Sequence, residues 1–181
     1  MSKFTDNASE KLLVVAGKIS NQKHMASIKN AFYTLMPVIL TGAFCTLISN
    51  VVCSTTTTGI SLAKLPGMSW LGMFTDLFAA ANYATLNFFT VAAVFLIGME
   101  LAKQNGLGDS PDSGVVAVCS FISVLPTYVV TTVNDVQVTV PNVLGKDYTA
   151  ARGLFLGMVI ALVSVEIYSK FVKSHVFDFK M

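Results

Sequence analysis

Charged side chains are scarce in this chain, and three long stretches have none. Asp, Glu, Lys and Arg make up 12% of the 181 residues, about half the share that is usual in soluble domains. None occurs between Lys29 and Lys64, between Asp76 and Glu100, or between Asp112 and Asp135. Each gap exceeds the roughly 20 residues that a helix needs to cross the ~30 Å hydrocarbon layer. The sequence therefore predicts an integral membrane protein.

Several kinds of chemistry are also absent. The three cysteines, Cys45, Cys53 and Cys119, form no CxxC pair, which argues against a zinc or redox site. His24 and His175 have no acidic or cysteine partner at ligand spacing, so no metal site is expected. A net charge of +2 without a basic cluster argues against nucleic-acid binding. No catalytic residue and no cofactor is predicted.

The first 30 residues differ from the remainder in pattern. The short apolar run that begins at Leu12 is followed by Lys18 and has no cleavage-like site, so it does not resemble a signal peptide. Asn7 and Glu10 fit a capping box at a helix start. We therefore expect residues 1–30 to form an amphipathic cytoplasmic helix on the membrane surface. An extension of the first membrane span is the alternative.

Residues 31–172 are expected to form the transmembrane domain, followed by a cytoplasmic tail at 173–181. Four spans are predicted, at about 31–53, 84–102, 115–132 and 152–172. Residues 67–81, which contain Trp70, fit a short interfacial or re-entrant helix before the second span. Ser110 as N-cap and Pro111 at the first helical position would begin the third span. The expected fold is all-α with four transmembrane helices.

Two prolines and one stretch of alternating apolar and polar residues predict local features of the fold. Pro37 should kink the first span, and Pro126 should bend the third near its far end. Val136, Val138 and Val140 alternate with polar residues, which predicts a small external β-hairpin over residues 129–141 with a turn at 134–135. An extended loop is the alternative interpretation.

The basic residues predict the orientation. With a cytoplasmic N-terminus, nine lysines lie inside, against Lys64, Lys146 and Arg152 outside. Loops rich in Lys and Arg stay in the cytoplasm. Both termini of this multi-pass chain are therefore expected on the cytoplasmic side of the cell (inner) membrane.

Glu166 is the acidic residue that most needs an explanation. It lies 14 positions after Arg152, about 21 Å deeper along the fourth span, and four positions before Lys170. One interpretation is a carboxylate near the inner interface that pairs with Lys170. The other is an acid that faces an internal polar cavity, because intramembrane carboxylates are costly unless they are used.

Other candidate residues concern packing and sugar binding. Gly153, Gly157 and Ala161 form a ridge of small residues on the fourth span, where another helix can approach closely. Asn82 and Asn87, beside two phenylalanines, have side-chain amides that can form hydrogen bonds with a sugar. An interfacial helix start with lipid-facing aromatics is the alternative.

Four segments together resemble a known family. "KISNQKHMASIKNAFYTLMPVILTGAF" is similar to the entry region of enzyme IIC, the membrane component of lactose/cellobiose-type sugar phosphotransferase systems. "NFFTVAAVFLIGMELAKQNGL" and "DSGVVAVCSFISVLPTYV" resemble that family's second and third spans. "GKDYTAARGLFLGMVIALVSVEIYSKFV" resembles it most closely. The resemblance covers nearly the whole chain.

The resemblance implies sugar transport. Enzyme IIC proteins carry a β-linked disaccharide across the inner membrane, and the IIB partner then phosphorylates it. They form homodimers, largely through the N-terminal half, whereas the sugar-holding residues lie mainly in the C-terminal half. This chain corresponds to the N-terminal half only, so we expect a truncated, dimer-forming scaffold that handles a disaccharide only when the missing half is present.

The sequence is also compatible with a different class of protein. The chain also fits a self-contained four-span membrane protein, such as a small transporter or a ligand-capturing subunit. Exporters of that size usually carry a carboxylate well inside a span. Here Glu100 and Glu166 both lie near predicted inner ends, which argues against that class.

Overall fold

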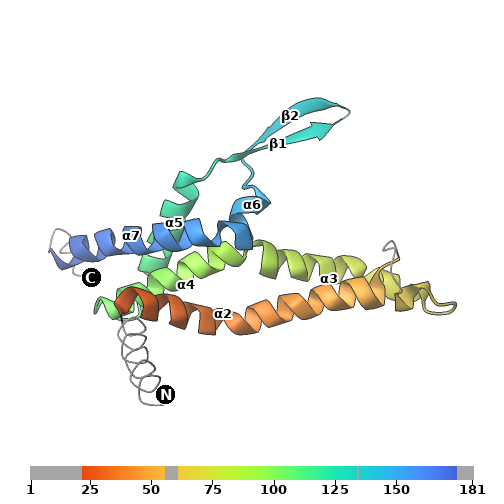
Figure 1. Ribbon diagram of the computed structural model, residues 1–181, viewed down its shortest axis with the longest axis horizontal. Helices are drawn as coiled ribbons and strands as arrows, with labels where there is room; N and C mark the ends of the chain where they lie inside the picture. Colours follow the sequence, from red (N-terminus) through yellow and green to blue (C-terminus); the bar gives the residue numbers. More distant parts are fainter. Residues whose placement is uncertain (1–21, 56–60, 134, 175–181) are drawn as a thin grey trace, which may run out of the picture.

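The computed structural model describes residues 22–55, 61–133 and 135–174. These residues are mostly helical and include one two-stranded sheet (Figure 1). The α-helices are α2 (Lys23–Leu47), α3 (Thr75–Asn82), α4 (Phe89–Gln104), α5 (Pro111–Val124), α6 (Lys146–Thr149) and α7 (Leu154–Lys173). π-Helical turns occupy Ile48–Cys53 and Tyr83–Asn87, and 3-10 turns occupy Leu62–Lys64, Ser69–Phe74 and Ala151–Gly153.

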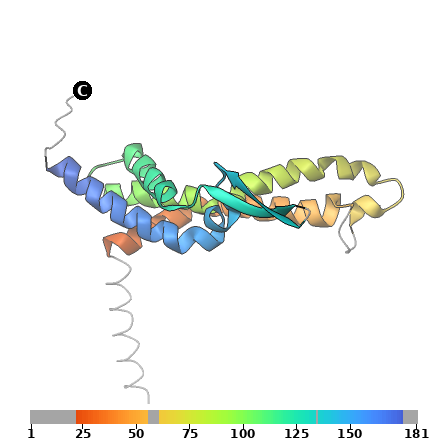
Figure 2. The ribbon, with the colours of Figure 1, turned by 90° about the horizontal axis from the view of Figure 1, so that it is seen from above.

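Helix α4 lies at the centre of the helical bundle. It packs against α2, α5 and α7, while α3 continues along the far half of α2 (Figures 1 and 2). The start of α2, the turn between α4 and α5, and the end of α7 lie together at one end of the bundle. We call this the Lys23 end. The α2–α3 pair extends beyond α5 and α7 in the opposite direction.

Two helices are long and apolar enough to cross a membrane. They cover Lys23–Cys53, 31 residues, and Ala151–Lys173, 23 residues. A third candidate consists of Ser69–Asn87 and Phe89–Gln104, which meet at a 43° bend. The described part of the chain thus has two or three membrane-capable helices by length and composition, together with a short apolar helix, α5.

The first span begins earlier than predicted. Helix α2 starts at Lys23, whereas the predicted boundary was residue 31, so residues 23–30 continue the span instead of forming a separate surface helix. Ser27 and Ala31 are both buried on one face of this helix, which explains why the first two turns pack within the bundle. The rest of the predicted surface helix lies outside the described residues. Pro37 lies inside α2, and the helix continues through it.

The second span also has different boundaries. The predicted helix over 84–102 is divided at Phe88, where a π-helical turn ends and α4 begins. The predicted interfacial helix at residues 67–81 appears as a 3-10 turn followed by α3. Because α3 runs through the π turn directly into the bend, these residues form one interrupted helical path.

The third predicted span, 115–132, is wrong at its C-terminal end. Ser110 precedes α5 and Pro111 begins it, as predicted, but the helix ends at Val124. Leu125 is extended because the ring of Pro126 disfavours the helical conformation in the residue before it. Pro126 therefore follows the helix and does not bend it.

The predicted β-hairpin is confirmed. Strand β1 (Tyr128–Val133) pairs antiparallel with β2 (Val136–Pro141), in a register that places Thr131 opposite Val138. Asp135 adopts a left-handed φ of 63°, which an Asp tolerates in a tight turn. The hairpin projects from the bundle beyond the end of α5 (Figure 1).

Small residues set the close approach of the helices to α4. A Cβ built on Gly157 of α7 would lie 2.7 Å from Val94 Cγ2. A Cβ on Gly98 would lie 2.8 Å from the Cβ of Ala117 in α5. The bundle core is correspondingly apolar; its fully buried residues include Leu35, Val94, Ile97, Leu101, Phe121 and Val165.

Candidate functional site

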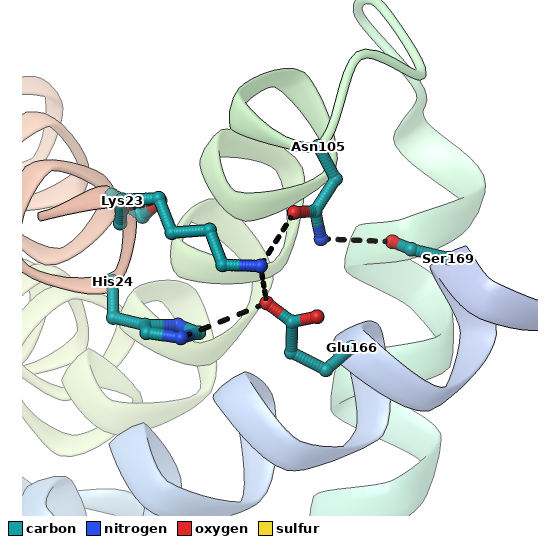
Figure 3. Close-up of polar contacts among 6 residues, drawn as sticks. Lys23, His24, Asn105, Glu166 and Ser169 are labelled. Carbon is teal, nitrogen blue, oxygen red and sulfur yellow. Dashed lines mark hydrogen bonds and ion pairs between the residues drawn. The ribbon is translucent and has the colours of Figure 1, made fainter.

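A cluster of polar side chains joins three helices at the Lys23 end. Figure 3 shows the side chains of α2 and α7 pointing toward one another across the end of α4. Lys23 Nζ lies 2.5 Å from Glu166 Oε1, and His24 Nε2 lies 3.7 Å from the same oxygen. This oxygen is buried and is held by charge, without a directed hydrogen bond. The carboxylate of α7 is therefore flanked by two groups from the start of α2.

Asn105 connects the cluster to the C-terminal end of α4. Lys23 Nζ donates a hydrogen bond to Asn105 Oδ1 at 3.1 Å, and Asn105 Nδ2 donates to Ser169 Oγ at 3.2 Å. Asn105 is the residue that follows α4, so its side chain reaches α2 on one side and α7 on the other (Figure 3). One amide thus ties together the ends of three helices.

The partner of Glu166 differs from the prediction. Lys170 was expected one turn along the same helix, but within the described residues the ion-pair partners of Glu166 are Lys23 and His24. The reason is the packing of α2 against α4, which brings the first turn of α2 to the end of α7. The side chain of Glu166 is 24% exposed, so the pair is only partly shielded from solvent.

A second carboxylate, that of Glu100, also receives a polar contact from α2. Asn30 Nδ2 donates a hydrogen bond to Glu100 Oε2 of α4 at 3.1 Å. Glu100 and Glu166 therefore both receive polar contacts from the first turns of α2. Such contacts lower the cost of placing carboxylates in an apolar bundle.

A separate polar pocket lies at the far end of α2. Its volume is about 290 Å³, and it is lined by Thr46, Ser49, Asn50, Ala79 and Asn82. Asn82 of α3 donates a hydrogen bond to Thr46 Oγ1, which itself donates to the Gly42 carbonyl at 2.8 Å. We call this the Asn82 pocket. None of these five lining residues, all from the described part of the chain, is charged.

The predicted candidates are not brought together into one site. Thr46, the partner of Asn82, is 23 residues from Lys23 along α2, about 35 Å at 1.5 Å per residue. Asn82 and Glu166 therefore belong to opposite ends of the molecule. Asn87 ends the second π-helical turn and is not part of the Asn82 pocket lining.

The ridge of small residues on α7 faces other parts of the chain. Gly153, Gly157 and Ala161 are all buried. A Cβ on Gly153 would overlap the Tyr148 carbonyl oxygen, and one on Gly157 would lie 2.8 Å from Thr90 Cγ2. Thr90 Oγ1 also donates a 2.6 Å hydrogen bond to the Ala150 carbonyl, which fixes the start of α7 against α4.

The described residues contain no cluster of potential metal ligands. In residues 22–55, 61–133 and 135–174, no three His, Cys, Asp or Glu side chains lie together as a metal site requires. His175 lies outside these ranges. The observed contacts hold the helix ends together at the Lys23 end. Neutral polar groups lie at the far end of α2.

Sequence reasoning missed several of these residues. Lys23, Asn105 and Ser169 complete the cluster around Glu166, and Ser49 and Asn50 complete the Asn82 pocket. A signal existed for Asn105, because it lies in the short polar turn between two apolar segments. None existed for Ser169, whose partner is 64 positions away in the sequence.

Long apolar helices that pack through small residues are typical of a membrane protein with more than one span. A family model described as "Phosphotransferase system, EIIC" matches residues 29–181. The chain therefore belongs to the EIIC family of the phosphotransferase system.

Individual relatives agree with this assignment. The oligo-beta-mannoside-specific EIIC component of Bacillus subtilis is 27% identical over 170 residues, which cover 94% of this chain and 36% of that protein. The cellobiose-specific EIIC component of Geobacillus stearothermophilus is 24% identical over 180 residues, or 97% of this chain and 38% of that protein.

A solved structure has the same fold. The transporter ChbC, the IIC component from the N,N'-diacetylchitobiose-specific phosphotransferase system, superposes with a TM-score of 0.75 at 25% identity. The match covers 95% of this chain and 39% of that one. The chain thus spans less than two fifths of the length of these three proteins.

Proposed function

We propose that this chain is the N-terminal part of an EIIC sugar permease for cellobiose- or lactose-like β-disaccharides, coupled to phosphorylation by a IIB component. The observation that carries the proposal is the superposition of 95% of the chain on a IIC transporter. The relatives' names add the sugar class, since they are specific for cellobiose or oligo-beta-mannosides. We assign the chain a scaffold role, in which transport requires the portion of those relatives that it does not match.

The scaffold would cross the membrane four times, and its transmembrane domain would run from the start of α2 to residue 172. Helix α5 has 14 residues, about 21 Å, and is the shortest candidate. The extended residues 125–127 add about 10 Å at roughly 3.3 Å each, which brings the total to the ~30 Å of the hydrocarbon layer. Residues 1–22 would lead in from the membrane surface to α2, and 173–181 would form the tail.

We place the Lys23 end on the cytoplasmic side of the inner membrane and the β-hairpin outside. Lys23, Lys103, Lys170 and Lys173 belong to helix ends at the Lys23 end, whereas Lys146 and Arg152 precede α7 at its opposite end. This asymmetry follows the positive-inside rule. It puts both termini in the cytoplasm, where a IIB component could reach the chain.

The proposed homodimer would use the outward face of α2. Leu40, Phe44 and Leu47 are each more than half exposed there and form an apolar surface along the helix. A second copy could bury this surface, and lipid would cover it otherwise. Cysteine cross-linking in membranes at Leu40, Phe44 and Leu47 in turn tests this arrangement, because in a two-fold symmetric contact the residue nearest the axis lies close to its own copy.

The transport proposal is tested by sugar uptake. Cells without a cellobiose permease would express this chain alone, the unmatched portion of the Geobacillus relative alone, or both together. We expect uptake of labelled cellobiose only with both, after fractionation shows that each piece is in the membrane. Uptake by this chain alone would contradict the scaffold role, and no uptake from the inserted pair would contradict the permease assignment.

A further inference from the structure

One side of α7 carries a long stripe of exposed apolar side chains. Val163, Ile167 and Phe171 are each more than half exposed, and Phe155 and Val159 extend the stripe toward the start of the helix. Each of these residues follows the previous one by four positions, the spacing that places side chains one above the other on a helix. In the part of the chain that the structure describes, this side of α7 is left open.

Two adjoining hollows lie on that side, toward the C-terminal end of α7. The first has a volume of about 430 Å³ and is lined by His24, Leu162, Val163, Glu166 and Ile167. The second has a volume of about 310 Å³ and is lined by Ile167, Lys170, Phe171 and Ser174. Ile167 belongs to both linings, so the hollows are neighbours. We call the two together the α7 groove.

The α7 groove has an apolar end and a polar end. Leu162 and Val163 line the first, whereas Lys170 and Ser174 line the second. Leu162 and Ser174 are 12 positions apart, from 162 to 174, which is about 18 Å along the helix axis. Half of the hydrocarbon layer is roughly 15 Å deep. The groove therefore has the length of one lipid leaflet, with its polar groups where a headgroup begins.

Lys170 gives the polar end a positive charge. The carboxylate of Glu166, which lines the neighbouring hollow, is compensated by Lys23 Nζ at 2.5 Å. Lys170 itself has no ion-pair partner among residues 22–55, 61–133 and 135–174. A lysine ammonium and a serine hydroxyl both donate hydrogen bonds, and phosphate oxygens accept them. The polar end of the groove is therefore suited to a phosphate group.

We propose that the α7 groove binds an anionic phospholipid. An acyl chain lies along Leu162, Val163 and Ile167, and the lipid phosphate accepts hydrogen bonds from Lys170 Nζ and Ser174 Oγ. Basic pockets beside membrane helices on the cytoplasmic side are sites where anionic headgroups bind. A zwitterionic lipid fills the apolar end equally well, but its headgroup also carries a positive charge, which Lys170 repels.

The leaflet in which this lipid lies rests on the proposed orientation of the chain. With the Lys23 end in the cytoplasm, Ser174 lies at the inner interface and Leu162 lies deeper in the bilayer. The groove lining and the ion pair that neutralises Glu166 depend neither on that orientation nor on a transported sugar. Vesicles with the same lipid mixture in both leaflets therefore test the site without assuming an orientation.

A tryptophan on the stripe reports which lipid lies beside it. In a Trp70→Phe background, which removes the single natural tryptophan, Phe171→Trp places the reporter in the groove. Phe155→Trp places it on the same stripe near the start of α7, and both phenylalanines are exposed. The 181-residue chain would be reconstituted in equal parts of phosphatidylcholine and phosphatidylglycerol, with bromine on the acyl chains of one or the other. Bromine quenches tryptophan fluorescence on contact, so quenching measures the local lipid composition.

The two reporters should differ. At Phe171→Trp we expect phosphatidylglycerol to be preferred over phosphatidylcholine about fivefold, which corresponds to the roughly 1 kcal/mol that one lysine contributes beside anionic lipid. At Phe155→Trp we expect no preference, because the nearby Arg152 is paired with Asp147 at 2.9 Å. An equal preference at the two positions overturns the proposal.

Lys170→Gln separates a defined site from a diffuse attraction. Combined with Phe171→Trp, this variant should lose the preference for phosphatidylglycerol. Lys173→Gln is the matched control, because Lys173 is exposed at the same end of α7 but does not line the groove. It should keep most of the preference. Equal losses in the two variants overturn the site in favour of general attraction by the lysines.

Two further measurements test other occupants of the groove. Excess glycerophosphate in solution should leave the quenching unchanged, and displacement by it would overturn a lipid ligand in favour of a free phosphate. The preference should also persist when the unmatched portion of the Geobacillus relative is inserted with this chain. Its loss there would overturn the proposal in favour of a contact between the two portions.

The lipid assay and the uptake assay fail independently. Cellobiose uptake by the two-piece permease without a lipid preference at Phe171→Trp would reject the groove while the proposed function stands. A lipid preference that depends on Lys170, without uptake by the inserted pair, would support the lipid site and contradict the permease assignment alone.

Discussion

Lys23 Nζ lies 2.5 Å from Glu166 Oε1, although the two residues are 143 positions apart in the sequence, from 23 to 166. One belongs to the first turn of α2 and the other to the last two turns of α7. The contact therefore joins the first and last helices of the bundle at a common end. Asn105 lies beside it and adds the end of α4.

The Lys23–Glu166 contact should be measurable as an energetic coupling. In a double-mutant cycle of Lys23→Met and Glu166→Gln, we expect a coupling of about 1 kcal/mol. This is the upper range for exposed pairs and reflects the partial burial of Glu166. The free energy of unfolding would be measured in mixtures of mild detergent and SDS.

The same cycle with Lys170 is the control. Lys170→Met combined with Glu166→Gln should give a coupling close to zero, since Lys170 is not an ion-pair partner of Glu166 in the described residues. A larger coupling to Lys170 than to Lys23 would show that the charge of Glu166 is balanced along its own helix.

Gly157→Ala should destabilise the bundle even though alanine favours helices. Its Cβ would meet methyl groups of Val94 at 2.7 Å and Thr90 at 2.8 Å, and both side chains are fully buried and stiff. Overpacking costs about 1–3 kcal/mol. The higher helix propensity of alanine offsets about 1 kcal/mol of that loss. We expect a net loss on the order of 1 kcal/mol, and a larger loss for Gly157→Leu.

Gly145→Ala provides the comparison for that substitution. A Cβ there would contact Tyr148 at 3.4 Å, an ordinary van der Waals distance. Its effect on the free energy of unfolding should stay within about 0.5 kcal/mol. Equal effects at positions 145 and 157 would contradict the close approach of α7 to α4.

Thr90→Val should loosen the start of α7. The valine keeps the shape but loses the 2.6 Å hydrogen bond to the Ala150 carbonyl, in a position with no exposed surface. We expect a loss of about 1 kcal/mol, typical of hydrogen bonds between membrane helices. Thr34→Val is the control, because its hydroxyl bonds only within α2, to the Asn30 carbonyl, and it should show little change.

The proposed orientation predicts which loops are accessible from outside the cell. In a background where Cys45, Cys53 and Cys119 are alanine, a membrane-impermeant maleimide should label Asp135→Cys on intact cells. Asp109→Cys, between α4 and α5, should react only after lysis. Both positions are exposed, so a difference reports sidedness and not burial. The reverse pattern would invert the proposed topology.

Much of the helical framework follows from hydrophobicity alone. The charge-free segments predict apolar helices, and the alternation of Val136, Val138 and Val140 predicts the hairpin because a period of two fits only a strand. The end of α5 was missed because apolar residues continue past Val124. Only the local effect of Pro126 on Leu125 marks the boundary.

The polar contacts were harder to predict. A pairing within one helix, such as Glu166 with Lys170, can be proposed from spacing, but the observed partner Lys23 depends on how α2 packs in the bundle. The same holds for Asn82 and Thr46, which are 36 positions apart. Side chains from separate helices meet only once the crossing of those helices is fixed, and that information is not local.

The length of the first helix has a further consequence. Lys23–Cys53 contains 31 residues and is about 45 Å long, roughly 15 Å more than the hydrocarbon layer is thick. Such a mismatch is relieved by tilting the helix or by letting its end protrude from the bilayer. With the orientation proposed above and the outer end protruding, bilayer thickness would set how far Thr46 and Asn82 stand above the lipid, and membranes of different lipid composition would expose the Asn82 pocket to water to different extents.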